Sequence, residues 1–418
     1  MFTILAPILA QLVTVGVGDR TEGRVINNGG TYTEAATYPV VGVALTERRF
    51  QLQLGYSPSI TVTPLGSEPR HLLLLHNLSQ VASYAWHRTT VTETQSLSFG
   101  EQNFRVLATS GAAVPPVGST GTPTTPAPGT GTPPTTGGTG TPGTPTPTPT
   151  PAPGSATNPA LNLRNSTIDL LSYSASVGVN HAVSSALSWQ TLAGYTIYGG
   201  TNPASRAQLP TVQGPIASLT VRDQLSGADN VSSTLSTQFS VSSNGNHTLL
   251  NNLAAGWTHA FNVMTSVQGS GGVSVARASH SDGYVAYSIF PTFGAGLTHV
   301  HPLHPGMLTL SLNGSAAPAL DFQTLIVDPR VGFGGTAGFT RDDFFASANV
   351  GSSYSISADS NGAFSGVTGG AGMGYRIATA VSIDTGVRIA WQSYQRANSL
   401  PWTYAAYLGL SVALSDRL

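Results

Sequence analysis

The chain has 418 residues, of which 40% are hydrophobic and only 8% are charged, and its formal net charge is −1. A soluble domain normally carries charge on about a quarter of its residues, so this composition is unusual for one. A near-neutral chain also lacks the basic stripe that nucleic-acid binding requires. The absence of cysteine excludes thiol catalysis, thiolate metal sites and disulfides, and it suits passage through an oxidising compartment.

The first ten residues, 1–10, have an apolar core and end on a small residue, which is typical of a secretion signal. They lack the positively charged leader of such signals, so two interpretations stay open. Either a signal is cleaved after Ala10, or these residues lead into the first strand. No stretch approaches the about 18 consecutive apolar residues of a spanning helix, so a membrane protein of this sequence must be a closed barrel.

Apolar and polar residues alternate along most of the chain, and this period of two predicts β-strands. The clearest stretches, 50–62 and 381–415, have runs of about 9–11 residues, the length that a tilted strand needs to cross a bilayer. Before the middle of the chain we expect strands at residues 11–24, 38–46, 50–63, 72–86 and 91–106, with a bulge at Pro58 because proline removes a ladder donor. Later strands are expected at residues 171–181, 187–198, 216–223, 231–241, 249–259, 263–277, 285–298, 307–314, 326–340, 344–356, 364–377, 381–392 and 404–415.

Residues 111–158 consist almost wholly of Pro, Thr, Gly, Ala and Ser and contain no aromatic or charged residue. Such a segment cannot bury a core, so we expect it to be disordered and partly polyproline II. It is either a linker between two domains or a long loop of one barrel. Strands of the same kind lie on both sides, and the five before it are fewer than the about 8 that the smallest membrane barrels have, which favours the loop.

The predicted fold is all-β: a transmembrane antiparallel up-and-down β-barrel of about 18 strands, formed by residues 11–418 as a single barrel in the cell outer membrane and in contact with its lipid. Short and longer breaks between strands alternate, as they do in bacterial outer-membrane barrels. Residues 299–306 are an exception, because this break is longer than its side of the barrel should allow. With the short turns on the periplasmic side, the Pro/Thr loop lies outside the cell.

Three stretches are similar to a known family of barrel proteins: TEGR at residues 21–24, LTERRFQLQLGYSPSITV at 45–62 and SLSFGEQNF at 96–104. They resemble the outer-membrane barrels that myxobacteria pair with periplasmic polysaccharide-export proteins. The resemblance implies a passage for secreted polysaccharide that works with such a periplasmic partner. One departure concerns assembly, since the chain ends Asp416-Arg417-Leu418 whereas such barrels usually end on an aromatic residue.

The sequence indicates no catalytic centre, no metal site and no cofactor. His299, His301 and His304 have metal-like spacing, but no carboxylate lies nearby and a turn explains them better. His280, Ser281 and Asp282 are the residue types of an acyl-transfer triad, but neighbours in one turn cannot adopt its geometry. The chain is therefore not expected to be an enzyme.

The alternation of the strands predicts a set of side chains that face the lumen of the barrel. These are Gln51, Gln53, Asp328, Arg330, Arg376, Asp384, Arg388 and Gln392. A barrel of about 18 strands is wide enough for an aqueous channel, and such a lining would let a hydrated, weakly charged polymer slide. Alternatively, the charges only pair across strands and brace the barrel. A general diffusion porin, and a surface structural or adhesive barrel that displays the Pro/Thr loop, are the other functions that stay open.

Overall fold

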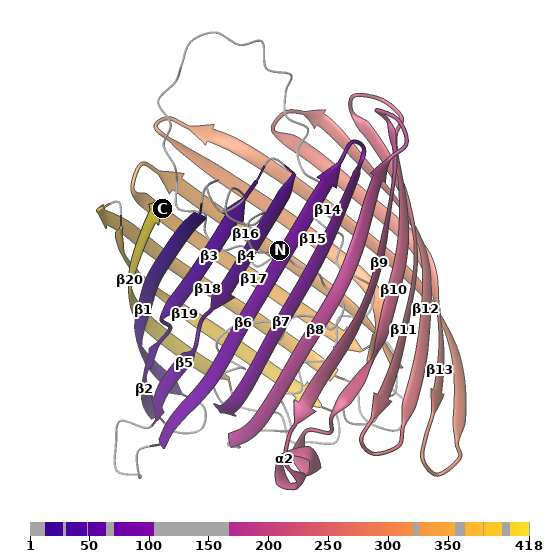
Figure 1. The fold of residues 1–418 in the computed structure, drawn as a ribbon, viewed down its shortest axis with the longest axis horizontal. Coiled ribbons are helices and arrows are strands. Elements are labelled where there is room, and N and C mark those ends of the chain that lie inside the picture. The colour runs from indigo at the N-terminus through magenta and orange to yellow at the C-terminus, as the bar shows by residue number, and fades with distance from the viewer. Residues whose placement is uncertain are drawn as a thin grey trace, which may run out of the picture.

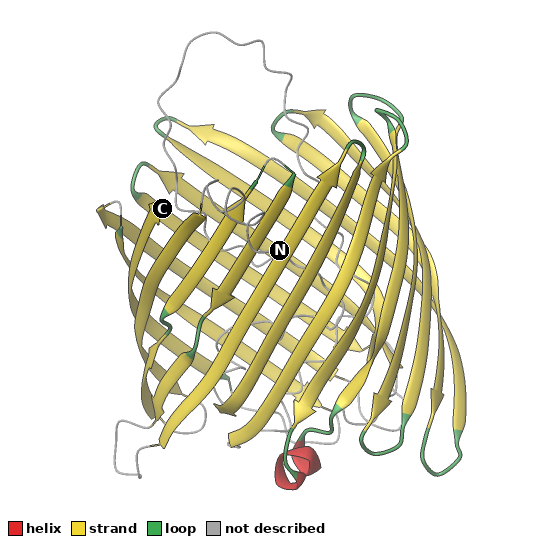
Figure 2. Cartoon of the chain, viewed as in Figure 1, coloured by secondary structure: helices red, strands yellow, loops and turns green. Residues whose placement is uncertain are grey.

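The computed structural model describes residues 13–27, 31–47, 49–63, 71–103, 167–320, 325, 327–355, 364–378, 380–394 and 402–417. This part of the chain is almost entirely β-strand, with one short helix (Figures 1 and 2). The elements are β1 (Val13–Asn27), β2 (Thr31–Thr37), β3 (Val40–Thr46), β4 (Phe50–Tyr56), β5 (Ser59–Thr63), β6 (His71–Trp86), β7 (Thr89–Asn103), β8 (Thr167–Ala182), β9 (Leu187–Gly200), α2 (Pro203–Gln208), β10 (Val212–Gln224), β11 (Asp229–Ser242), β12 (His247–Asn262), β13 (Thr265–Ser279), β14 (Val285–Leu303), β15 (Gly306–Leu320), β16 (Val327–Arg341), β17 (Phe344–Ser355), β18 (Phe364–Ala378), β19 (Val381–Tyr394) and β20 (Thr403–Arg417). The expected signal segment 1–10 and the Pro/Thr segment 111–158 lie outside the described residues.

The strands form one antiparallel sheet that closes on itself. From β6 onward consecutive strands pair with each other around the barrel, and β1 pairs with β20 from Thr14–Arg417 to Asn27–Tyr404. β7 and β8 also pair along their whole length, from Thr89–His181 to Asn103–Thr167, so residues 104–166 connect neighbouring strands of one barrel. The predicted fold class, a closed antiparallel barrel, is confirmed.

The 20 strands of the described residues occupy 18 positions around the barrel. β2 and β3 both pair with β1 and together make one barrel strand. β4 and β5 both pair with β6 and make the next one. The prediction of about 18 strands is therefore confirmed.

Two prolines cause these breaks, and they lie opposite each other. Thr37 pairs with Ile60 and Val41 with Tyr56, which places Pro39 against Pro58 in the continued register. Because proline has no backbone N–H, neither chain can donate to a ladder there. The structure thus has a break in both strands where the sequence suggested a bulge at Pro58 alone.

The two ends of the barrel differ in the length of their connections. At the end that holds Val13 and Arg417, here called the turn end, the described connections are short, for example residues 87–88, 263–264 and 304–305. The opposite loop end has the longer ones, including residues 201–211, where α2 lies (Figure 1). The expected exception at residues 299–306 is wrong, because β14 continues to Leu303 and turns at His304 and Pro305. Short turns at one end and longer loops at the other are typical of outer-membrane barrels.

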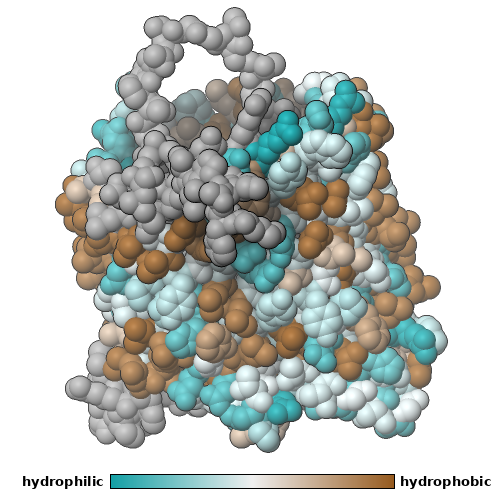
Figure 3. Space-filling view, viewed as in Figure 1, coloured by the Kyte–Doolittle hydropathy of each residue, from teal (hydrophilic) through white to brown (hydrophobic). Residues whose placement is uncertain are grey.

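The outer face of the wall carries many large apolar side chains. On the side that faces the viewer in Figure 3, hydrophobic patches lie among neutral and hydrophilic residues. Large exposed apolar side chains recur at every second residue of the strands, for example Leu219 and Val221 in β10, Val273 and Val275 in β13, and Leu408 and Leu410 in β20. The residues between them belong to the inner face and are mostly small or polar. No helix of the described residues is long and apolar enough to cross a membrane.

Neighbouring residues in the middle of β11 test the assignment of the two faces. Leu235 is 53% exposed on the outer face and Ser236 lies on the inner face. Leu235→Arg should destabilise the barrel in lipid by about 2–4 kcal/mol, because it places a charge against the hydrocarbon. Ser236→Arg should cost much less, since its side chain meets the lumen. Urea unfolding in lipid vesicles measures both, and equal losses would contradict this assignment.

Candidate functional site: the inner wall of the barrel

Hydroxyl groups pair across neighbouring strands along the inner wall. The described pairs join Thr94 to Ser176, Ser96 to Ser174, Thr220 to Thr234 and Ser311 to Thr336, with oxygen–oxygen distances of 2.7–3.1 Å. A hydroxyl both donates and accepts hydrogen bonds, so each keeps capacity for water or for another hydroxyl compound. This lining can therefore exchange one weak polar contact for another.

A charged cluster lies on the inner face where β1, β19 and β20 meet, beside the strand pair that closes the barrel. Arg20 of β1 forms ion pairs with Glu22 at 2.8 Å and with Asp384 of β19 at 2.7 Å. The guanidinium of Arg388 lies 4.9 Å from the centre of the Tyr407 ring in β20, and that of Arg20 lies 5.9 Å from it. We call these five residues the closure cluster. Two guanidinium groups balance two carboxylates, so the cluster carries no net charge.

Glycines on the inner face leave room for the larger side chains of this cluster. A Cβ added to Gly372 would lie 2.9 Å from the hydroxyl of Tyr407, and one on Gly386 would lie 2.8 Å from the same ring. A Cβ added to Gly409 would lie 2.8 Å from a carboxylate oxygen of Asp384. Tyr407 and Asp384 therefore lie flat against backbone that has no side chain of its own, which keeps them out of the interior.

The eight residues that the sequence assigned to the lumen lie at several separate places in the barrel. Asp384 and Arg388 belong to the closure cluster. Asp328 and Arg330 lie together at the loop end of β16, 3.3 Å apart, and Ser355 of β17 donates a hydrogen bond to Asp328. They do not come together with the closure cluster in a single site.

The other four predicted residues lie elsewhere on the wall. Gln51 and Gln53 of β4 pair with Ser83 and Val81 of β6. Arg376 pairs with Ser382 near the turn end. Gln392 pairs with Gly366, and its side chain is not among the described ones. That these residues line a passage stays a prediction.

Sequence reasoning missed three members of the closure cluster: Arg20, Glu22 and Tyr407. Arg20 and Glu22 alternate along β1 with the exposed apolar residues Val17 and Val25, so the argument from alternation that found Asp384 also applies to them. Tyr407 carries no such signal, because tyrosine is common on either face of a strand. Only the register shows that it lies beside Gly386.

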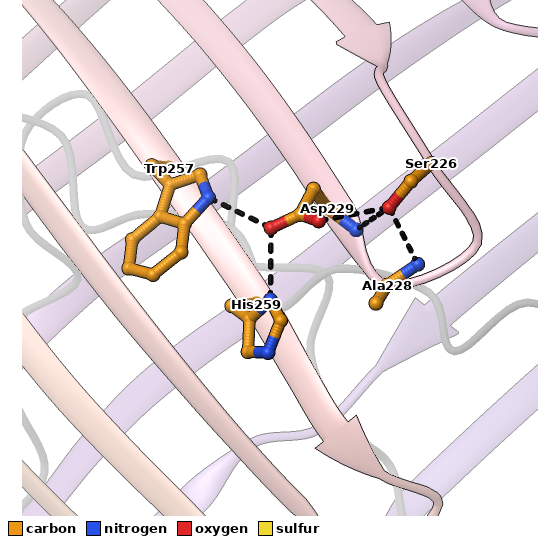
Figure 4. Close-up of polar contacts among 5 residues, drawn as sticks. All are labelled: Ser226, Ala228, Asp229, Trp257 and His259. Atoms are coloured by element: carbon orange, nitrogen blue, oxygen red, sulfur yellow. Dashed lines mark hydrogen bonds and ion pairs between the residues drawn. The ribbon is translucent and has the colours of Figure 1, made fainter.

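A second polar group lies at the turn end, on the outer face (Figure 4). Asp229 accepts hydrogen bonds from the Trp257 indole at 3.1 Å and from Ser226 at 2.8 Å, and it lies 2.8 Å from Nδ1 of His259. These contacts fasten the turn before β11 to β12. Trp257 and His259 at this end of the barrel suit the membrane–water interface, so we assign the group a bracing role.

The three histidines at the end of β14 and the turn after it do not form a metal centre. His299 and His301 stack with ring centres 5.9 Å apart, and Nδ1 of His299 lies 2.9 Å from the hydroxyl of Thr265. Within the described ranges, no group of three or more His, Cys, Asp or Glu residues could hold a metal ion.

A closed antiparallel barrel with an apolar outer face, a polar inner face and short turns at one end is a transmembrane barrel of the outer-membrane type. The model of the EpsX exopolysaccharide export family matches residues 27–417, and the chain belongs to this family. The protein is thus a porin-like barrel of the outer membrane, in contact with its lipid. No curated protein matches the chain.

Solved structures with a similar arrangement of strands share little sequence with this chain. OccAB4 of Acinetobacter baumannii has a TM-score of 0.48 at 8% identity, over 98% of this chain and 100% of the other. The FrpB iron transporter of Neisseria meningitidis has a TM-score of 0.49 at 8% identity, over 98% of this chain and 83% of the other. The outer membrane protein opdK of Pseudomonas aeruginosa has a TM-score of 0.46 at 10% identity, over 97% and 99%.

The glycines beside Tyr407 generate a testable expectation. Gly372→Ala should destabilise the barrel by about 1–3 kcal/mol, because the new methyl group must push the Tyr407 ring away from the wall. Gly338→Ala is the matched control, since nothing lies within 4 Å of its added Cβ. Thermal unfolding followed by the mobility shift of the folded barrel on gels measures the difference. In the double variant with Tyr407→Ala most of the penalty should disappear, and a fully additive double variant would contradict the contact.

Proposed function

We propose that the interior of the barrel is the passage for a secreted polysaccharide, working with a periplasmic polysaccharide-export protein at the turn end. The observation that carries the proposal is the inner wall: hydroxyls, glycines and charges that are balanced by neighbouring charges. Membership of an exopolysaccharide export family supports the nature of the cargo. The proposal concerns the interior of the porin-like outer-membrane barrel described above.

Such a wall suits a long polar polymer because it binds each sugar unit weakly. Hydroxyl groups of the wall exchange hydrogen bonds with water and with sugar hydroxyls at similar free energy, so no single position retains the chain. Arg20 already bonds two carboxylates, which weakens its attraction for a passing anion. Glycines beside Tyr407 and Asp384 let these side chains lie close to the wall, which leaves more room for the polymer at this level of the barrel.

The lining residues would contribute in three groups. Gln51, Gln53 and Gln392 would offer neutral amide groups, each able to donate and accept hydrogen bonds. Asp384 and Arg388 would act within the closure cluster. Asp328, Arg330 and Arg376 would place charge near the two ends, where the polymer enters and leaves. These roles extend the prediction from the sequence and include the residues that it missed, Arg20, Glu22 and Tyr407.

Two measurements together test this function. A strain that lacks the protein should lose secreted polysaccharide, and the full-length chain should restore it. The purified barrel should give steady steps of conductance in a planar bilayer, since a hydrated passage also carries ions. Deleting residues 111–158 should leave both results unchanged.

Each other outcome points to a different function. Conductance together with normal secretion in the null strain would identify a general diffusion porin. If deletion of residues 111–158 abolishes polysaccharide secretion although the shortened barrel still conducts, the result would identify a barrel that displays its loop at the surface. If the correctly folded barrel never conducts in a planar bilayer and the null strain still secretes polysaccharide, the interior is not the passage.

A further inference from the structure

The loop end of the β15–β16 hairpin leaves the wall of the barrel. β14 and β15 pair from Leu303–Gly306 up to Phe293–Ala316, and there the pairing stops. β14 nevertheless begins at Val285 and stays paired with β13 along its whole length. β15 and β16 stay paired with each other up to Leu320–Val327. In the described chain, residues 285–292 of β14 therefore have no strand partner on the β15 side.

Three prolines stand where the separation occurs. Pro318 of β15 pairs with Pro329 of β16, and the continued register of β14 and β15 would place Pro291 opposite Pro318. None of the three can donate a backbone hydrogen bond to a ladder. The ladder between β14 and β15 would lack both backbone donors at this row, so the row is a weak point at which the two strands can separate. We define the hairpin end as residues 317–320, Leu325 and residues 327–329. The row of prolines is its hinge.

The hairpin end lies inside the barrel. Further down β15, Leu310 and Leu312 belong to the outer face and are 39% and 61% exposed. Ala316 and Leu320 have the same parity, but they are only 2% and 5% exposed. Pro318, also of this parity, is fully buried. Side chains that would meet lipid in a regular barrel are therefore covered by protein.

The residues that cover these side chains lie on the inner face of strands across the barrel, near its loop end. Leu320, Leu325 and Val327 belong to one buried apolar cluster with residues of β8, β9, β10, β12, β13 and the segment after α2: Ile168, Leu170, Tyr198, Val212, Leu250, Ala276 and Leu209. The hydroxyl of Thr248 in β12 also donates a hydrogen bond to the carbonyl oxygen of Leu325 at 2.5 Å.

This cluster reaches across the interior of the barrel. β8 and β16 are separated by eight of the 18 strand positions, because consecutive strands from β8 to β16 are neighbours. They consequently stand nearly opposite each other, and a continuous apolar cluster between them occupies part of the passage near the loop end. The polymer would meet this obstruction before it reaches the exterior.

We propose that the hairpin end is a movable constriction of the passage, which rests on the proposed function. Its buried face is apolar, so it suits two environments: the apolar cluster inside the barrel, or lipid and membrane interface beside β14. The prolines weaken its place in the wall and so favour the inward position, while the unpaired edge of β14 leaves the wall position available. Movement of the hairpin end toward β14 widens the passage, and its return narrows it.

A disulfide tests this constriction, since the chain has no cysteine of its own. Thr248→Cys with Leu325→Cys should fix the hairpin end against β12 upon oxidation. Leu310→Cys with Ala337→Cys is the matched control, because these paired residues link β15 to β16 within the regular wall on its outer face, away from the passage. Single-channel recordings of both variants in planar bilayers, oxidised and then reduced, give the comparison, with bond formation verified by gel mobility and mass.

In the Thr248/Leu325 variant the largest conductance level should be lost upon oxidation and return upon reduction, while the control should not respond. A third variant, Leu320→Asp, should raise the conductance because it places a charge in the apolar cluster. Failure of the first disulfide to form in a folded barrel, or conductance that is the same in both redox states, would overturn the constriction and leave the passage intact. If no variant conducts in either state, the passage itself is wrong and the constriction falls with it.

Discussion

The structure depends on one constraint: a backbone within a membrane must find all its hydrogen-bond partners in the protein. Lipid offers neither donors nor acceptors, and each unpaired group costs several kcal/mol there. A chain of alternating strands can meet this demand only if its first strand pairs with its last. The pairing of β1 with β20 over 14 residue pairs, from Thr14–Arg417 to Asn27–Tyr404, provides that closure.

The inner wall follows from the closure. Once the sheet is closed, one side-chain parity meets lipid and the other meets the interior, so the small and polar residues of every strand gather on one surface. The closure cluster lies beside the strand pair that closes the barrel, where Arg20 of β1 joins Asp384 of β19 across β20. The charges thus connect the two ends of the chain and balance each other inside the passage.

The β15–β16 hairpin is the exception that the same constraint permits. Its strands leave the ladder at the loop end, where water, other protein groups or the membrane interface can satisfy free backbone groups. Thr248 supplies one of these partners, as a donor to Leu325. Within the described part of the barrel, the separation coincides with the row of Pro291, Pro318 and Pro329.

The alternation of residues predicted the fold well because the two faces of a membrane barrel differ so strongly. It gave the number of strands and the two kinds of connection. It could not show lateral pairing, so it recognised Pro58 but not its partner Pro39, and none of the aligned prolines at the hinge. It also ended β14 too early at residue 298, because the histidines and proline before the turn looked like a loop.

The inward position of the hairpin end was beyond this kind of reasoning for a physical reason. Ala316, Pro318 and Leu320 alternate with their neighbours as any lipid-facing residues would. An apolar side chain has the same sequence signature whether it is covered by lipid or by an apolar cluster of the protein. Only the contacts with residues of β8 to β13 distinguish the two environments.

The central claim is that the closed wall separates a wet interior from lipid, and cysteine scanning along β11 tests it most directly. Single cysteines at residues 231–238, in barrels reconstituted in lipid vesicles, are exposed to a water-soluble maleimide. We expect rapid labelling at Ser232, Thr234, Ser236 and Gln238 and protection at Val231, Ser233, Leu235 and Thr237. Labelling without this period of two, or protection at all eight positions, would contradict a water-filled passage.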